Sequence, residues 1–370
     1  MFTKEEEAMI EEGRKRWQGV PKAELHVHLG GTVRPATLVE LAASKGQPRP
    51  RIAPGRSTLS ECFEIFRAVH DAVCTGPDIA RITREAVTDM AADGVRYLEL
   101  RTTPRDLADG VSAADYVDIV VDAARREIAE RGLDIAVGVL VSVDRARPVA
   151  EAERNVRIAA QHAPSAAVAG TRAGAPFAGV VGVDLSGNPG AGSFAAVQPA
   201  LDYARDAAGL PVTVHAAECE RPAETRAVLA WGPRRVGHAV CVADAGVRAE
   251  MAACRVPVEV CLSSNLFSRS IAAPRAHPFV ASGSTNPRCL CTDDPGVFAT
   301  TLSREWAIAE ALCGLPPAEL LAMSRNSLEY SFAPPAVLDH CRPLFARASV
   351  HGAPAPAAPL AGSPPTPLSQ

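Results

Sequence analysis

Apolar residues recur along the chain in short runs that alternate with longer amphipathic stretches. Eight of these runs are rich in β-branched residues and are bounded by turn residues, which is typical of buried strands. They cover residues 23–31, 95–101, 135–141, 180–185, 211–215, 235–238, 256–261 and 288–292. Apolar residues at helical spacing predict helices between them, over 79–92, 113–131, 149–160, 195–208 and 243–253.

The alternation of strands and helices predicts the fold class. Near-continuous apolar strands separated by helices indicate an α/β protein with a parallel sheet that helices cover. Eight repeats of this unit favour a (β/α)₈ TIM barrel. A doubly wound open sheet is the alternative. Against it, no G-x-G-x-x-G follows the first strand, and polar residues cluster at the ends of many strands rather than at one switch point.

Several segments lie outside this repeat. Charged residues at helical spacing predict an N-terminal helix over 4–17, and the apolar stripe at 59–66 predicts an extra helix near the mouth of the barrel. That stripe either packs into the core or forms a lid over a pocket. We expect one domain over 1–350, a surface insert rich in Ala and Gly at 163–178, and a disordered Pro/Ala-rich tail at 351–370.

Composition narrows the class of partner. The chain has 370 residues, a hydrophobic content of 47% and a formal net charge of −4. No basic stripe for nucleic acid and no apolar run long enough for a transmembrane helix is present in the sequence. The first residues lack an apolar signal segment, and the ten cysteines include no C-x-x-C, so we expect reduced thiols and a cytoplasmic location. The expected partner is a small molecule, bound by a monomer.

The first strand carries the first candidate chemistry. His26 and His28 lie two residues apart, so their side chains project from the same face of a strand. A single histidine in an apolar strand is usually a core residue, but two at this spacing, followed by Gly30 and Gly31, suit one divalent metal ion.

The other strands supply the remaining groups, because function in a TIM barrel sits at the carboxyl ends of the strands. Polar residues end the fourth to eighth strands. The metal ligands we predict are His26, His28, His215 and Asp293. Three imidazoles and a carboxylate suit one Zn²⁺ per chain with a position left for water, although Fe²⁺ and Co²⁺ fit almost as well.

Three further residues complete a catalytic set. Glu218 could protonate a ring nitrogen of the substrate, while His238 and Asp294 could orient the water or accept a hydrogen bond from the substrate. Because zinc makes water a nucleophile at neutral pH, the reaction class is metal-assisted hydrolysis at an sp² carbon.

The motifs at 21–29 (PKAELHVHL), 215–218 (HAAE), 236–238 (VGH) and 291–295 (CTDDP) resemble the adenosine deaminase family, in the same order and at similar spacing. The resemblance implies a (β/α)₈ barrel, catalytic Zn²⁺ and hydrolytic deamination at C6 of a purine. By matching position it implies the four metal ligands above, Glu218 as proton donor to N1, His238 as the partner of the attacking water, Asp294 at N7 and Gly187 at N3.

Other stretches resemble the branch of this family that acts on N6-methyl-AMP: 61–66 (ECFEIF), 97–105 (YLELRTTPR), 184–189 (DLSGNP) and 291–300 (CTDDPGVFAT). Classical adenosine deaminases carry Asp at the position of Gly30, where it binds the ribose 5′-hydroxyl, and the N6-methyl-AMP branch usually carries Asn. Because a carboxylate there would repel a 5′-phosphate, Gly30 permits a nucleotide. The expected reaction converts N6-methyl-AMP to IMP and methylamine.

A nucleotide requires further contacts. The candidate phosphate donors by location are Thr32, Thr102, Thr103 and Arg105, and Phe63 is the candidate wall of an apolar slot for the N6-methyl group.

Three rival functions remain. The nearest is deamination of adenosine or another 6-aminopurine nucleoside to give inosine and ammonia. A non-catalytic purine-binding or metal-binding protein is more remote, because the full set of ligands and Glu218 are present. A cyclic-amide hydrolase with two metals would need a carboxylated lysine on a central strand, and no predicted strand carries a lysine after Lys22.

Overall fold

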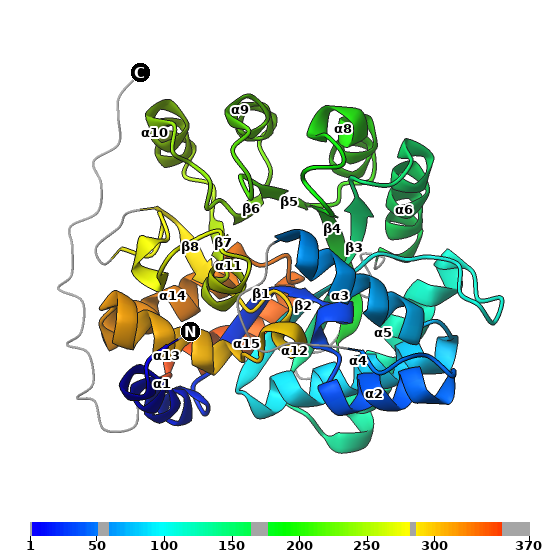
Figure 1. Ribbon diagram of the computed structural model, residues 1–370, viewed down its shortest axis with the longest axis horizontal. Coiled ribbons are helices and arrows are strands. Elements are labelled where there is room, and N and C mark those ends of the chain that lie inside the picture. The colour runs from blue at the N-terminus through cyan, green and yellow to red at the C-terminus, as the bar shows by residue number, and fades with distance from the viewer. Residues whose placement is uncertain (1, 51–58, 164–176, 282–285, 350–370) are drawn as a thin grey trace.

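The computed structural model describes residues 2–50, 59–163, 177–281 and 286–349, and it places eight parallel strands at the centre of the molecule (Figure 1). The strands are β1 (Lys22–His28), β2 (Val95–Thr102), β3 (Ala136–Asp144), β4 (Ala178–Ser186), β5 (Val212–Ala216), β6 (Arg235–His238), β7 (Val258–Val260) and β8 (Arg288–Leu290). Each strand pairs in parallel with the next along the chain. All eight predicted strands are confirmed.

Asp293, just beyond β8, brings the two ends of the sheet together. Its backbone N–H donates to the carbonyl of His26 at 2.8 Å, and its carbonyl accepts from the N–H of His28 at 2.9 Å. The resulting bridge between Val27 and Asp293 joins the first strand to the last, so the sheet is a nearly closed (β/α)₈ barrel rather than an open sheet. The same bridge places Asp293 beside the two histidines of β1.

The helices surround this barrel (Figure 1). They are α1 (Lys4–Trp17), α2 (Pro35–Ser44), α3 (Leu59–Ala72), α4 (Gly76–Ala92), α5 (Ala113–Arg131), α6 (Val149–His162), α8 (Phe194–Asp202), α9 (Pro222–Trp231), α10 (Ala245–Cys254), α11 (Leu262–Phe267), α12 (Pro295–Phe298), α13 (Leu302–Cys313), α14 (Pro317–Tyr330) and α15 (Pro335–Ala346). The predicted helix over 195–208 is interrupted, since α8 ends at Asp202 and a π-helical turn follows over Tyr203–Ala207. Pro199 inside α8 lacks the N–H that a regular helix needs.

The N-terminal helix forms where it was predicted, over Lys4–Trp17. Thr3 and Glu6 make a reciprocal capping box at its start, and Trp17 at its end packs edge-on against Trp306 of α13, with ring centroids 5.2 Å apart. The helices α2 and α3 lie between β1 and β2 in sequence, and α3 forms one wall of the cavity described below.

Two predicted segments lie outside the described residues. The tail at 351–370 does so entirely, and the insert at 163–178 does so except at its ends, so both stay predictions. Within the described ranges, none of the helices is both long enough and apolar enough to cross a membrane.

Candidate metal centre and active site

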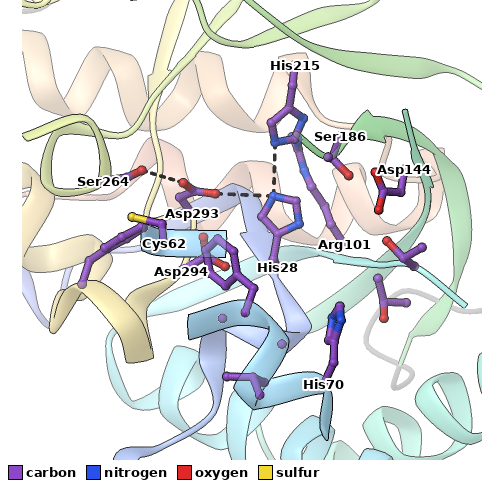
Figure 2. Close-up of a pocket in the computed structure, with 18 of the residues that line it drawn as sticks. His28, Cys62, His70, Arg101, Asp144, Ser186, His215, Ser264, Asp293 and Asp294 are labelled. Atoms are coloured by element: carbon purple, nitrogen blue, oxygen red, sulfur yellow. Dashed lines mark hydrogen bonds and ion pairs between the residues drawn. The ribbon is translucent and has the colours of Figure 1, made fainter. Parts of the chain in front are cut away.

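Three histidines and an aspartate converge at the carboxyl end of the barrel. Figure 2 shows three of the four, His28, His215 and Asp293. One donor atom from each of His26, His28, His215 and Asp293 lies within 4.8 Å of the others. The Nε2 atoms of His28 and His215 are 3.2 Å apart, and Asp293 Oδ1 lies 3.3 Å from His26 Nε2 and 3.4 Å from His28 Nε2. Within the described part of the chain, the buried His26 Nε2 has no hydrogen-bond partner. Nitrogens converging in this way fit a divalent cation at their centre.

Acceptors behind the candidate metal site fix which nitrogen faces it in two of the three imidazoles, those of His26 and His215. Nδ1 of His26 lies 2.8 Å from Glu259 Oε2, and Nδ1 of His215 lies 3.1 Å from Asp184 Oδ1 and 2.9 Å from the carbonyl of Leu185. Because Nδ1 donates its proton to these acceptors, the unprotonated Nε2 is left to bind the metal.

Arg101 joins the two supporting carboxylates beneath the site. This fully buried side chain lies 2.9 Å from Asp184 Oδ1 and 2.6 Å from Glu259 Oε2. Glu259 also pairs with the buried Arg235, which in turn pairs with Glu99. The buried arginines hold the pKa of Asp184 and that of Glu259 below the usual range of a carboxyl group. Both side chains therefore stay ionised and can accept hydrogen bonds.

Glu259 and Arg101 were not among the site residues predicted from the sequence. A signal for them was present in the sequence. Glu259 interrupts an apolar strand and Arg101 ends one, and a charged residue in a buried strand must have a partner. The sequence alone did not reveal which residues those partners were.

The backbone conformation sets the direction of two side chains of the candidate site, those of Asp293 and His238. Asp293 and His238 both have a φ of 63°, in the left-handed region that non-glycine residues seldom occupy. Each stands where a strand gives way to a loop, so the turn directs the side chain into the mouth of the barrel. Ser264 donates to Asp293 Oδ2 at 2.6 Å, which leaves Oδ1 facing the histidines.

Glu218 and His238 face each other beside the candidate metal ligands. His238 Nε2 lies 3.8 Å from Glu218 Oε2 and 3.9 Å from Asp293 Oδ2, while its Nδ1 lies 3.2 Å from the amide nitrogen of Asn265. The Oε1 atom of Glu218 is buried and finds no hydrogen-bond partner among the residues that the structure describes. Burial raises the pKa of Glu218, as expected of a carboxylic acid that must hold a proton.

Two glycines allow the site to pack closely. A Cβ at Gly31 would lie 1.9 Å from Asp294 Oδ1, and a Cβ at Gly187 would lie 1.9 Å from Asp144 Oδ1, so neither position can carry a larger residue as the structure stands. Gly187 also has a φ of 91°. Burial and the neighbouring Asp293 raise the pKa of Asp294, which favours a protonated carboxyl group there.

A cavity opens above these residues. On one side the wall is apolar and comes mainly from α3 and α4, through Cys62, Phe66, Val69, Val73, Ile79 and Ile82. Of the substrate-binding residues predicted from sequence, Gly30, Gly187, Thr102, Thr103 and Arg105 line the cavity.

Two further substrate-binding residues predicted from the sequence, Thr32 and Phe63, are not placed in the lining of the cavity. Thr32 does not line the cavity, because its buried hydroxyl donates to the carbonyl of Leu29 at 2.8 Å. The side chain of Phe63 lies outside the described part of the chain. Among the residues that do line the cavity, the Thr102 hydroxyl is 2.7 Å from that of Tyr116, and Arg105 donates to the carbonyl of Val73 at 2.7 Å.

Comparisons with known proteins agree with this geometry. The model of the adenosine deaminase family matches residues 21–340. A protein of Arabidopsis thaliana named N6-mAMP deaminase is 35% identical over 363 residues, which cover 90% of this chain and 98% of that protein. Solved structures of Arabidopsis ADAL with IMP and with GMP are each 34% identical with a TM-score of 0.80. They cover 89% and 90% of this chain and 97% and 98% of their own chains, respectively.

Proposed function

This chain belongs to the adenosine deaminase family, whose members are hydrolytic deaminases, and we propose that it converts N6-methyl-AMP and water to IMP and methylamine. The observation that carries the proposal is the convergence of four side chains that could hold a metal ion beside the mostly buried carboxyl group of Glu218, at the base of a cavity. The substrate follows from the relative named N6-mAMP deaminase and from the solved structures of ADAL with IMP and with GMP.

The metal centre would be held by His26, His28, His215 and Asp293, and we propose zinc as the metal. Zinc in such a site makes water a nucleophile at neutral pH. A cytoplasmic monomer remains part of the proposal, and the ten free cysteines agree with a reducing compartment.

The protein's own residues would act on the purine from several strand ends. Glu218 would give its proton to N1, which makes C6 more electrophilic, and His238 would accept a proton from the attacking water. Asp294, whose raised pKa favours the protonated acid, would donate a hydrogen bond to N7. The backbone at Gly187, which lines the cavity and carries no side chain of its own, would contact N3.

The 5′-phosphate would lie at the rim near Thr103 and Arg105. Both line the cavity, and Thr102 lies beside them at the end of β2. His70 of α3 lines the same cavity and adds a further candidate donor. Arg105 can offer a guanidinium to the phosphate while it keeps its bond to the Val73 carbonyl.

Turnover of four substrates tests the proposal. We expect the zinc-loaded protein to prefer N6-methyl-AMP over N6-methyladenosine, AMP and adenosine when the purine absorbance change is followed. A preference for adenosine would support the nucleoside deaminase instead. No turnover by a protein shown to hold its metal would support the non-catalytic binding protein.

Gly30→Asp tests the role of the missing carboxylate. A Cβ at Gly30 would meet only Val69 Cγ1, at an ordinary 3.8 Å, so the position has room for a side chain. A carboxylate about 5 Å from a phosphate oxygen costs about 3 kcal/mol at an effective dielectric of about 20, so kcat/KM for N6-methyl-AMP should fall about 100-fold relative to N6-methyladenosine.

Gly30→Asn is the matched control, because it adds nearly the same volume without the charge. It should keep the preference for the phosphorylated substrate. Equal selectivity in the aspartate and asparagine variants would mean that the phosphate lies away from residue 30.

A further inference from the structure

Asp144 is a carboxylate in the cavity that none of the roles above uses. It is the last residue of β3, it lines the cavity, and its side chain is 28% exposed. Its Oδ1 accepts the N–H of Ala146 at 2.9 Å. Its Oδ2 has a long ion pair, 3.9 Å, with the mostly exposed Arg147. One carboxylate oxygen is therefore available to a ligand.

The order of the strands places Asp144 relative to the substrate. Neighbouring strands β5, β4, β3 and β2 follow one another around the barrel. Past their ends lie Glu218, assigned to N1, then Gly187, assigned to N3, then Asp144, and then Thr102 to Arg105, assigned to the phosphate. In a purine nucleotide the ribose lies between N3 and the 5′-phosphate. Asp144 occupies the corresponding place in the wall.

Two geometric observations support this position of Asp144. A Cβ built on Gly187 would lie 1.9 Å from Asp144 Oδ1, so the carboxylate is directly beside the backbone assigned to N3. The pairing of Asp144 with Ser186 in the β3–β4 register brings the two strand ends level. Figure 2 shows Asp144 next to Ser186, on the side of the cavity away from Asp293 and Ser264.

We propose that Asp144 accepts hydrogen bonds from the 2′- and 3′-hydroxyls of the ribose, and that it thereby selects ribonucleotides over 2′-deoxyribonucleotides. A carboxylate suits this role because it only accepts hydrogen bonds and can take one from each hydroxyl of the cis-diol, as acidic residues do in dinucleotide-binding folds. The substrate would then be a ribonucleotide, the kind of nucleotide found in RNA, and not the 2′-deoxyribonucleotide found in DNA. This inference rests on the proposed function for the orientation of the nucleotide.

Paired substrates test the role of Asp144. In the wild type, kcat/KM for N6-methyl-AMP should exceed that for its 2′-deoxy analogue by about 10- to 100-fold, the value of a hydrogen bond to a charged group. In Asp144→Ala this ratio should fall toward one, because the ribonucleotide loses the hydrogen bonds of both hydroxyls whereas the deoxynucleotide loses only that of its 3′-hydroxyl. Binding of IMP against 2′-deoxy-IMP by calorimetry should change in parallel.

Two further variants separate this role from simpler ones. Asp144→Asn keeps the volume beside Gly187 and an acceptor for the Ala146 N–H, so it should fold normally and reduce the ratio by a smaller factor than alanine. Glu151→Gln removes a nearby negative charge that does not line the cavity, so it should leave the ratio unchanged. An unchanged ratio in Asp144→Ala, or an equal loss with both sugars, would overturn the proposal.

The sugar comparison remains informative if the proposed function fails. A protein that prefers nucleosides can be assayed with adenosine and 2′-deoxyadenosine in the same variants. Loss of the ribose preference would then support Asp144 although the phosphate assignment is wrong. If turnover is absent with every substrate, the calorimetric comparison decides the role of Asp144.

Discussion

Glu218→Gln is expected to lower kcat by about 10²- to 10⁴-fold, because an amide cannot supply the proton that general acid catalysis delivers to the purine ring. The structure favours this residue, since the Glu218 side chain is only 13% exposed and, among the described residues, its Oε1 has no hydrogen-bond partner. Metal content and the affinity for IMP should be nearly unchanged. Steady-state kinetics, metal analysis and calorimetry on the same preparation measure all three quantities.

The pH profile gives this prediction a second readout. Burial raises the pKa of Glu218, and the protonated form is the donor. In the wild type kcat/KM should therefore fall as the pH rises through that pKa, and the glutamine variant should lack this alkaline decline. Glu220→Gln is the matched control, because Glu220 is exposed two residues further on and accepts only the N–H of Ala243. A Glu218 variant with nearly full activity would remove this residue from the mechanism.

His28→Ala is expected to remove the metal and to lower kcat/KM by about 10³-fold or more, since a catalytic metal contributes several kcal/mol to the transition state. Of the three histidines that we propose as ligands, His28 is the most exposed, at 23% of its side chain, so its loss should disturb the fold least. Metal analysis should find the variant depleted of metal after dialysis.

Thermal unfolding checks the same site without any assay of activity. Adding Zn²⁺ to metal-depleted wild type should raise Tm, because a ligand that binds only the folded state stabilises it. The alanine variant should show a much smaller rise. His340→Ala on α15 serves as the control, since this histidine is 38% exposed and lies outside the metal-binding group. Equal stabilisation of His28→Ala and the wild type would place the metal elsewhere.

Much of the barrel could be predicted because its signals are local. Each strand is a short apolar run with turn residues at its ends, and each motif residue stands at such an end. Once eight units are counted, the parallel topology brings His26, His215 and Asp293 together, although they are far apart in sequence. The candidate metal-binding group could therefore be predicted from the sequence alone.

The supporting contacts could not be predicted in the same way. Glu259 lies 233 residues from His26, and the pairing depends on the stagger of eight strands and on side-chain rotamers rather than on a local pattern. Thr32 is the converse case. Its position just after β1 predicted a side chain in the cavity, whereas its hydroxyl closes a turn within residues 29–32. Proximity in sequence to a strand end did not determine the direction of the side chain.

The buried ion pairs also constrain how the barrel can assemble. Glu99 and Arg101 lie on β2, in the first four strands, whereas Arg235 and Glu259 lie on β6 and β7. A half-barrel of β1 to β4 would keep the Arg101–Asp184 pair but would leave Glu99 without its arginine and His26 without its carboxylate. An unpaired buried charge costs several kcal/mol. The two halves are therefore interdependent, and the polar interior that holds the histidines forms only when the second half closes on the first.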